Sequence, residues 1–156
     1  MLKLTKKADY GLIAMRHLAS CEDHSACSAK EIADCYGIPQ EALAKILQRL
    51  AKAKLLASQH GINGGYALAR EARNISAFEV IKAIEGPLFI TSCTTSHGDC
   101  MQSPKCTVRE PLRKVSETIQ QVLTRMKISD MLPESREAGS EPEPSVQAQA
   151  ELVRLS

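Results

Sequence analysis

Apolar residues recur every three or four positions over the first fifty residues, which is the spacing of one buried helix face. Three helices are predicted from this pattern, and their ends are marked by residues that cap helices. The first lies within residues 4–20, with Thr5 as its N-cap. The second begins at the capping box Ser28-Ala-Lys-Glu31 and ends at Gly37, and the third follows Pro39, with its apolar face made of Leu43, Ile46, Leu47 and Leu50. Two short helices joined by a tight turn predict a helix-turn-helix.

The apolar period changes to two after Lys54, where residues 55–59 and 66–70 flank the glycine-rich turn 60–65. This pattern predicts a β-hairpin directly after the helix-turn-helix, in the position of a wing. A second capping box, Ser76-Ala-Phe-Glu79, predicts a further helix that ends at Gly86.

From residue 108 onward the apolar residues alternate spacings of four and three among charged neighbours: Val108, Leu112, Val115, Ile119, Val122 and Met126. So narrow a stripe is typical of a coiled-coil seam and predicts a long helix that pairs with its copy in a second chain. The alternative is a helix packed back on its own domain. The last residues, 133–156, are rich in Pro, Glu and Ser, which predicts a disordered tail.

These elements predict a mainly α fold, a winged helix-turn-helix with a small β-hairpin wing and a long C-terminal dimerisation helix. An aromatic content of 3% and the absence of Trp also favour helix packing over a β-sandwich. The predicted regions are a DNA-binding domain over 1–86, a cysteine loop over 87–106, the dimerisation helix over 107–132 and the tail. A signal peptide and membrane-length apolar runs are lacking, so a cytoplasmic location is predicted.

The charge distribution favours a polyanionic partner for the first part of the chain. The whole sequence carries +2, and residues 133–156 hold five acidic and two basic residues, so residues 1–132 carry +5. A basic winged helix-turn-helix is typical of proteins that bind double-stranded DNA, although the same shape also serves as a packing module. The expected DNA-contacting residues lie on the third helix and the hairpin: Gln40, Glu41, Lys45, Lys52, Lys54, His60, Asn63, Gly64 and Gly65. The two glycines permit positive φ and close backbone approach, which would let the loop lie against a phosphate backbone or enter a minor groove.

Three of the six cysteines, Cys93, Cys100 and Cys106, lie close together among Gly, Ser, Asp and Pro. Thiols in such a segment have no apolar neighbours to pack against, and cytosolic thiols stay reduced, so a metal or iron-sulfur site is favoured. A cluster-free regulator in which Cys93 and Cys100 oxidise to a disulfide is the main alternative. An enzyme is not predicted, because a redox Cys-x-x-Cys motif is absent.

Two further cysteines and two histidines fall around the end of the first predicted helix: His17, Cys21, His24 and Cys27. Structural zinc modules contain ligand pairs at tight spacing, which this segment lacks. A zinc site is therefore not favoured there on sequence alone.

Taken together, residues 1–132 resemble the IscR/NsrR family of winged-helix iron-sulfur regulators. The resemblance is carried by the opening LTKKADYGL, the wing loop GINGGY, the Cys-x(6)-Cys-x(5)-Cys loop and the following CTVREPLRKV, and is strongest to the branch that regulates the SUF cluster-assembly system. It implies that Cys93, Cys100 and Cys106 hold an iron-sulfur cluster, with 2Fe-2S favoured over 4Fe-4S. The implied protein is a homodimeric regulator, expected to be a repressor, that senses cluster status, redox state or nitric oxide, with cluster-assembly proteins as candidate donors.

The same resemblance leaves the fourth cluster ligand open. Some members use a histidine at the position of Arg109, and arginine cannot serve as such a ligand. Others use an aspartate from the first helix of the partner chain, and Asp9 occupies that position. His97 and a small exogenous ligand are the alternatives. His60 stands where relatives often have a wing arginine, so a minor-groove contact by the wing is not implied.

Overall fold

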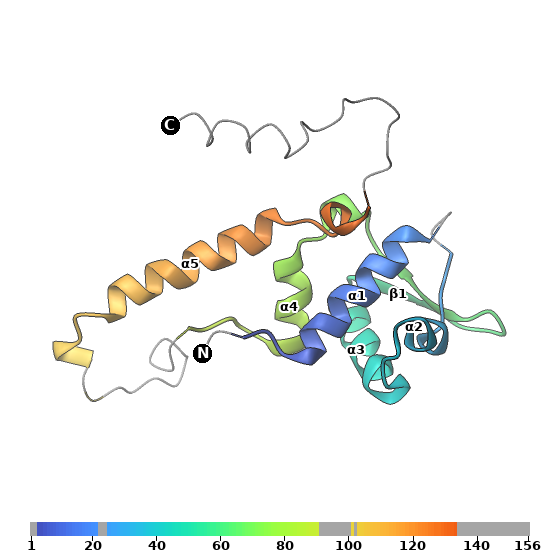
Figure 1. The fold of residues 1–156 in the computed structure, drawn as a ribbon, viewed down its shortest axis with the longest axis horizontal. Coiled ribbons are helices and arrows are strands. Elements are labelled where there is room, and N and C mark those ends of the chain that lie inside the picture. Colours follow the sequence, from blue (N-terminus) through green and yellow to red (C-terminus); the bar gives the residue numbers. More distant parts are fainter. Residues whose placement is uncertain (1–2, 22–24, 91–100, 102, 134–156) are drawn as a thin grey trace, which may run out of the picture.

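The structure is a computed structural model that describes residues 3–21, 25–90, 101 and 103–133. Its helices are α1 (Lys6–Ser20), α2 (Ala29–Tyr36), α3 (Gln40–Lys52), α4 (Ala77–Glu85) and α5 (Arg109–Arg125), and its strands are β1 (Leu56–Gln59) and β2 (Gly65–Leu68). Short 3-10 turns follow as η2 (Ala72–Asn74), η4 (Ser103–Lys105) and η5 (Ile128–Met131). The predicted fold class, a winged helix-turn-helix with a long C-terminal helix, is confirmed (Figure 1).

Helix boundaries follow the capping residues seen in the sequence. The Thr5 hydroxyl accepts a hydrogen bond from the Ala8 N–H, and both Ser28 and Ser76 form complete capping boxes. Gly37 ends α2 with φ of 64°, a left-handed conformation that glycine adopts without a steric penalty. The turn into α3 is therefore fixed by local chemistry.

The core lies where α1 crosses α3 and α4. Met15 and Leu18 of α1 are buried there, and all four apolar residues predicted for α3 are buried as well. Full burial of each such side chain contributes roughly 1.5–3 kcal/mol relative to exposure. This packing holds α3 rigidly while its opposite face stays in solvent.

The wing is joined to the body through the residue before α2. Strands β1 and β2 are antiparallel, and Cys27 extends the ladder because its N–H and C=O bond to Tyr66 at 3.0 and 2.9 Å. A Cβ on Gly65 would lie 2.5 Å from the Cys27 carbonyl oxygen, so this approach requires glycine. Gly64 and Gly65 do not adopt the positive φ that glycine permits; in this turn it occurs at Gly61 (121°). Their close approach is to the protein's own backbone, with Gly64 packed against the Gln59 carbonyl.

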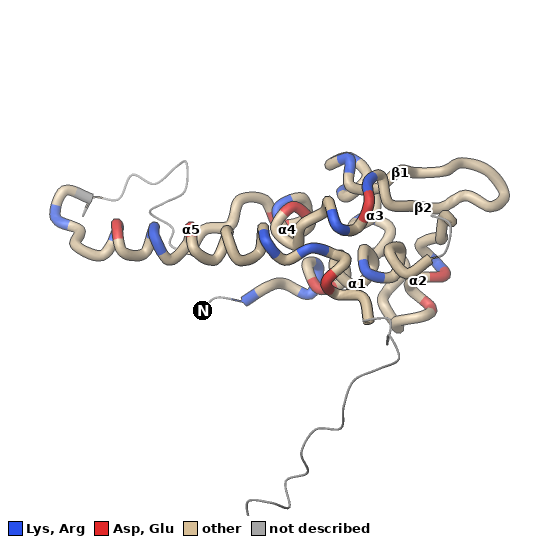
Figure 2. The backbone as a smooth tube through the Cα atoms, turned by 90° about the horizontal axis from the view of Figure 1, so that it is seen from above, with Lys and Arg blue, Asp and Glu red and all other residues tan. Residues whose placement is uncertain are grey.

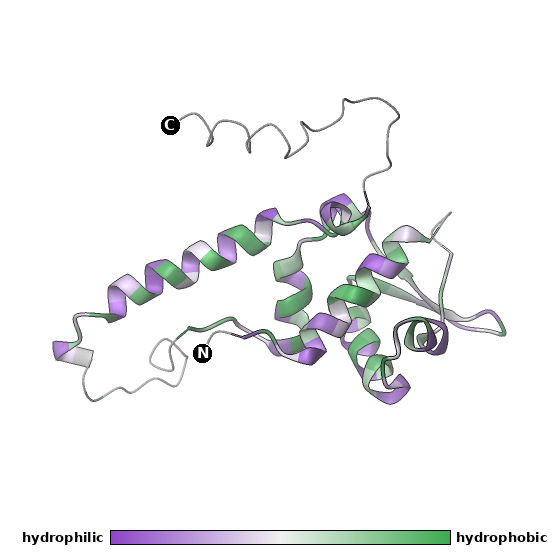
Figure 3. Cartoon of the chain, viewed as in Figure 1, coloured by the Kyte–Doolittle hydropathy of each residue, from purple (hydrophilic) through white to green (hydrophobic). Residues whose placement is uncertain are grey.

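Helix α5 extends away from the body as an arm (Figure 1). The start of α5 is its distal end, so the chain runs back to the body along the helix (Figure 1). Ile128, just after α5, is fully buried in the core, and its N–H bonds to the Ile75 carbonyl at 2.9 Å. One edge of α5 is anchored by the Gln120 side chain, which donates to the Leu88 carbonyl at 3.2 Å. Apolar and polar positions alternate along the arm in Figure 3, and Val115 and Val122 of the predicted stripe are 48% and 55% exposed.

Candidate functional site

The solvent-facing side of α3 is the first candidate surface. Gln40, Glu41, Lys45 and Lys52 are exposed there, as predicted from their positions on the polar face. A groove between α3 and the wing is lined by Lys45, Gln48, Arg49, Ala51, Lys52, Ser58 and Tyr66. An exposed basic helix beside a hairpin can lie against a polyanion.

Two residues of this groove, Gln48 and Arg49, were not among the sequence-predicted contacts. They follow Lys45 by three and four positions, so helical periodicity alone could have placed them on the same face. Arg49 also has a structural role, because its Nη1 donates a hydrogen bond to the Ile84 carbonyl at 2.8 Å. That bond fixes α3 against the end of α4.

The wing carries very little charge. The hairpin over residues 56–68 contains no Lys, Arg, Asp or Glu, and its loop is uniformly tan in Figure 2. His60 and Asn63 are exposed in this turn, whereas Gly64 and Gly65 are half-buried. Lys54, exposed between α3 and β1, has φ of 61°. Contacts from the wing to a partner would therefore depend on neutral side chains and the backbone.

The structure shows one of the three clustered cysteines. Cys106 is half-buried between η4 and α5, whereas Cys93, Cys100 and the alternative ligand His97 lie outside the described residues. Asp9 is exposed in the first turn of α1.

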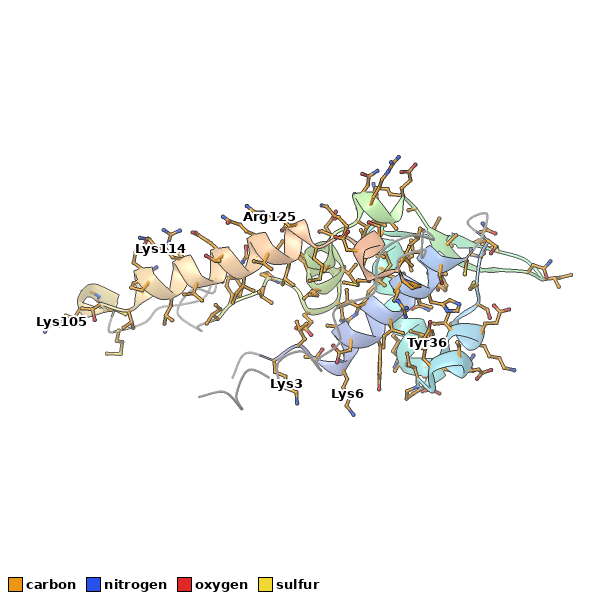
Figure 4. The ribbon with its side chains drawn as sticks, turned by 45° about the horizontal axis from the view of Figure 1, so that its top comes forward. Lys3, Lys6, Tyr36, Lys105, Lys114 and Arg125 are labelled. Atoms are coloured by element: carbon orange, nitrogen blue, oxygen red, sulfur yellow. The ribbon has the colours of Figure 1, made fainter. Side chains whose placement is uncertain are left out.

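Asp9 and Cys106 are not brought together within one chain. Lys105, adjacent to Cys106, lies at the far end of the α5 arm in Figure 4, and Lys6, in the same first turn of α1 as Asp9, lies on the body. Helix α5 has 17 residues, which corresponds to about 25 Å at 1.5 Å per residue. A site that used both residues would need two chains.

A second sulfur-containing group lies where α1 meets α2. One donor atom from each of His17, Cys21 and Cys27 lies within 4.8 Å of the others, and the two Sγ atoms are 3.0 Å apart. Burial raises the pKa of the Cys27 thiol to about 12, with a smaller contribution from the Cys21 thiol beside it. The sequence did not favour a metal site here, yet the fold brings three of the four considered donors together; the fourth, His24, lies outside the described residues.

Comparisons with known proteins identify the fold and family. T. potens IscR is 31% identical, with a TM-score of 0.68 over 91% of this chain and 94% of that one. CymR, the global cysteine regulator of B. subtilis, is 27% identical, with a TM-score of 0.68 over 84% and 96%. S. aureus CymR is 25% identical, with a TM-score of 0.64 over 87% and 100%.

A family model for iron-dependent transcriptional regulators, named Rrf2, matches residues 4–134. This match and the IscR and CymR similarities confirm the predicted resemblance and the prediction of a regulator rather than an enzyme. Among the described helices none has the length and apolar character needed to cross a membrane. The chain therefore belongs to the Rrf2 family of iron-dependent transcriptional regulators.

Proposed function

We propose that this regulator is a cytoplasmic homodimer whose affinity for operator DNA depends on an iron-sulfur cluster held by Cys93, Cys100 and Cys106. The observation that supports this most is the position of Cys106 directly before α5. In the sequence these ligands lie between the body that carries α3 and the arm that carries the apolar stripe, and Lys105, beside Cys106, lies at the far end of that arm (Figure 4). The donor set fits the group, because cysteine thiolates are the usual ligands of iron-sulfur clusters.

Dimer geometry would convert a change at the cysteines into a change in DNA affinity. Two recognition helices must reach half-sites one DNA turn apart, about 34 Å, and tolerate little error in that spacing. When bound, the cluster supplies a group that iron supply, oxidation or nitric oxide can alter. The cysteines that hold it would then restrain the start of α5 and, through the arm, the separation of the two α3 helices.

Cluster content gives the direct test of this function. Anaerobically purified protein is expected to contain iron and acid-labile sulfide and to absorb visible light, and Cys93→Ala or Cys100→Ala should abolish all three signals. Cys35→Ala is the matched control, because Cys35 is exposed on α2 and outside the proposed set. Operator binding, measured with and without the cluster, should differ.

Two outcomes would oppose the cluster. Retention of wild-type absorption in Cys93→Ala protein would exclude that residue as a required ligand. Iron-free protein that forms a Cys93–Cys100 disulfide on peroxide treatment would instead establish the thiol-based alternative. A purely redox-thiol regulator uses the same loop and would also respond to oxidation.

Lysines of α3 are proposed to contact DNA phosphates. Lys45→Ala with Lys52→Ala should weaken binding similarly on all sequences and reduce the salt slope by about 4, because the homodimer loses two phosphate contacts per chain and each lost contact removes about 1. Lys114→Ala, which removes an exposed charge on the arm (Figure 4), should leave the slope unchanged. An unchanged slope in the double variant, measured by fluorescence anisotropy at several salt concentrations, would contradict these contacts.

A further inference from the structure

We propose that His17, Cys21 and Cys27 form a mononuclear site for a thiophilic divalent cation, zinc above all, separate from the cysteine loop over 93–106. Two thiolates and one imidazole are a common zinc donor set, with a fourth position left for water or another ligand. Two thiolates also neutralise the charge of the ion. The proposal concerns the body of the protein and is independent of whether a cluster binds elsewhere.

The donor geometry is close to that of a zinc site. Zinc binds sulfur at about 2.3 Å and nitrogen at about 2.0–2.1 Å, so two donors in tetrahedral positions around one ion lie about 3.5–3.8 Å apart. Here the three donor atoms all lie within 4.8 Å of one another. The Sγ atoms, at 3.0 Å, need to separate slightly to take tetrahedral positions around an ion.

Local structure holds each donor in place. His17 lies in the last turn of α1 and Cys21 is its C-cap, where the Cys21 thiol donates to the His17 carbonyl at 3.4 Å. The His17 ring packs edge-on against Tyr36 at a centroid distance of 5.5 Å, and its Nδ1 is 3.1 Å from the Tyr36 hydroxyl. Cys27 is fixed by its two backbone bonds to Tyr66. Each of the three donor residues is therefore held by a contact of its own before any ion binds.

A histidine at this point favours a metal over a simple disulfide. Joining Cys21 to Cys27 would use both sulfurs and leave the nearby imidazole with only its Tyr36 contact. A zinc ion uses all three groups, and its binding releases the thiol protons to solvent. The reducing compartment proposed for this protein also opposes a resting disulfide.

A bound ion at this site would restrain the wing relative to α1. Cys27 is bonded through its backbone to β2, so an ion that ties Cys27 to the end of α1 also restrains the hairpin relative to α1. Loss of the ion should loosen the hairpin and weaken DNA binding without removing any residue of the α3 surface.

Metal analysis of full-length protein tests the proposal. The background carries Cys93→Ser, Cys100→Ser and Cys106→Ser, which removes thiolates that could bind zinc in the loop. We expect one zinc per chain after dialysis, and cobalt substitution should give thiolate-to-metal charge-transfer absorption. Cys21→Ser with Cys27→Ser should remove both signals, whereas Cys35→Ser should retain them.

A milder variant covers the case in which the double cysteine variant does not fold. His17→Ala keeps both thiols, and competition with a chromophoric chelator should show zinc affinity reduced by about tenfold or more. Zinc retained at wild-type affinity in His17→Ala, or one zinc per chain in folded Cys21→Ser/Cys27→Ser protein, would overturn the proposal. So would zinc-free protein in which mass spectrometry finds Cys21 linked to Cys27.

Discussion

Val115→Asp combined with Val122→Asp is expected to convert the proposed dimer into a monomer and to lower operator affinity by about 100-fold or more. Both side chains lie on the apolar stripe of α5 and are about half-exposed in the single chain, at 48% and 55%. Pairing two stripes would bury them, and a carboxylate at each position cannot be buried there without a partner. A monomer also loses the gain of 10²–10⁴ that two linked half-site contacts provide.

Sedimentation velocity and operator titration on the same samples check this expectation. The matched control is Gln121→Asp with Thr124→Asp, which adds the same charge at exposed positions of α5 outside the stripe. The control should remain dimeric with near wild-type affinity. A dimeric Val115→Asp/Val122→Asp protein would show that α5 does not form the interface, and would favour a helix that packs within its own chain.

Features set by neighbouring residues were predictable from the sequence. The capping boxes at Ser28 and Ser76 and the buried face of α3 follow from chemistry within one or two helical turns, and all appear in the structure. The hairpin also follows from a local change of period. Such interactions need no knowledge of the tertiary fold.

Features that join distant segments were not predictable. Gly65 is required by the Cys27 backbone, nearly forty residues earlier, and not by a turn or by DNA. Ile128 belongs to the core although it follows the arm, since it pairs with Ile75. The proximity of Cys27 to His17 and Cys21 likewise depends on the β2 strand that positions Cys27. In each of these three cases the position of the residue depends on pairing with a distant segment, which local sequence patterns do not reveal.

Asp9→Ala is expected to destabilise the proposed cluster, because Asp9 is proposed to supply the fourth ligand from the partner chain. In this structure Asp9 is exposed in the first turn of α1 on the body, whereas Lys105, the neighbour of Cys106, lies at the far end of the α5 arm (Figure 4). Among the described residues the Asp9 carboxylate has no hydrogen bond or ion pair, so its oxygens are available to a neighbouring chain. Cluster absorption of the Asp9→Ala homodimer should decay faster in air than that of the wild type, and an unchanged decay would exclude Asp9.

Heterodimers distinguish a ligand supplied by the partner from one supplied by the same chain. An Asp9→Ala chain, paired through a second affinity tag with a Cys106→Ser chain, should retain one stable cluster per dimer if Asp9 acts across the interface. The site with intact cysteines then receives Asp9 from its partner. If Asp9 acted within its own chain, neither site would be complete.

The reciprocal heterodimer provides the control and reverses the expectation. A chain that carries both Asp9→Ala and Cys106→Ser, paired with a wild-type chain, should have no complete site if Asp9 acts across the interface, and one if it acts within its chain. The two heterodimers contain the same substitutions in different arrangements, so differences in overall stability cannot imitate the result. A stable cluster in the second dimer but not in the first would assign Asp9 to its own chain and would require an arm conformation other than the one seen here.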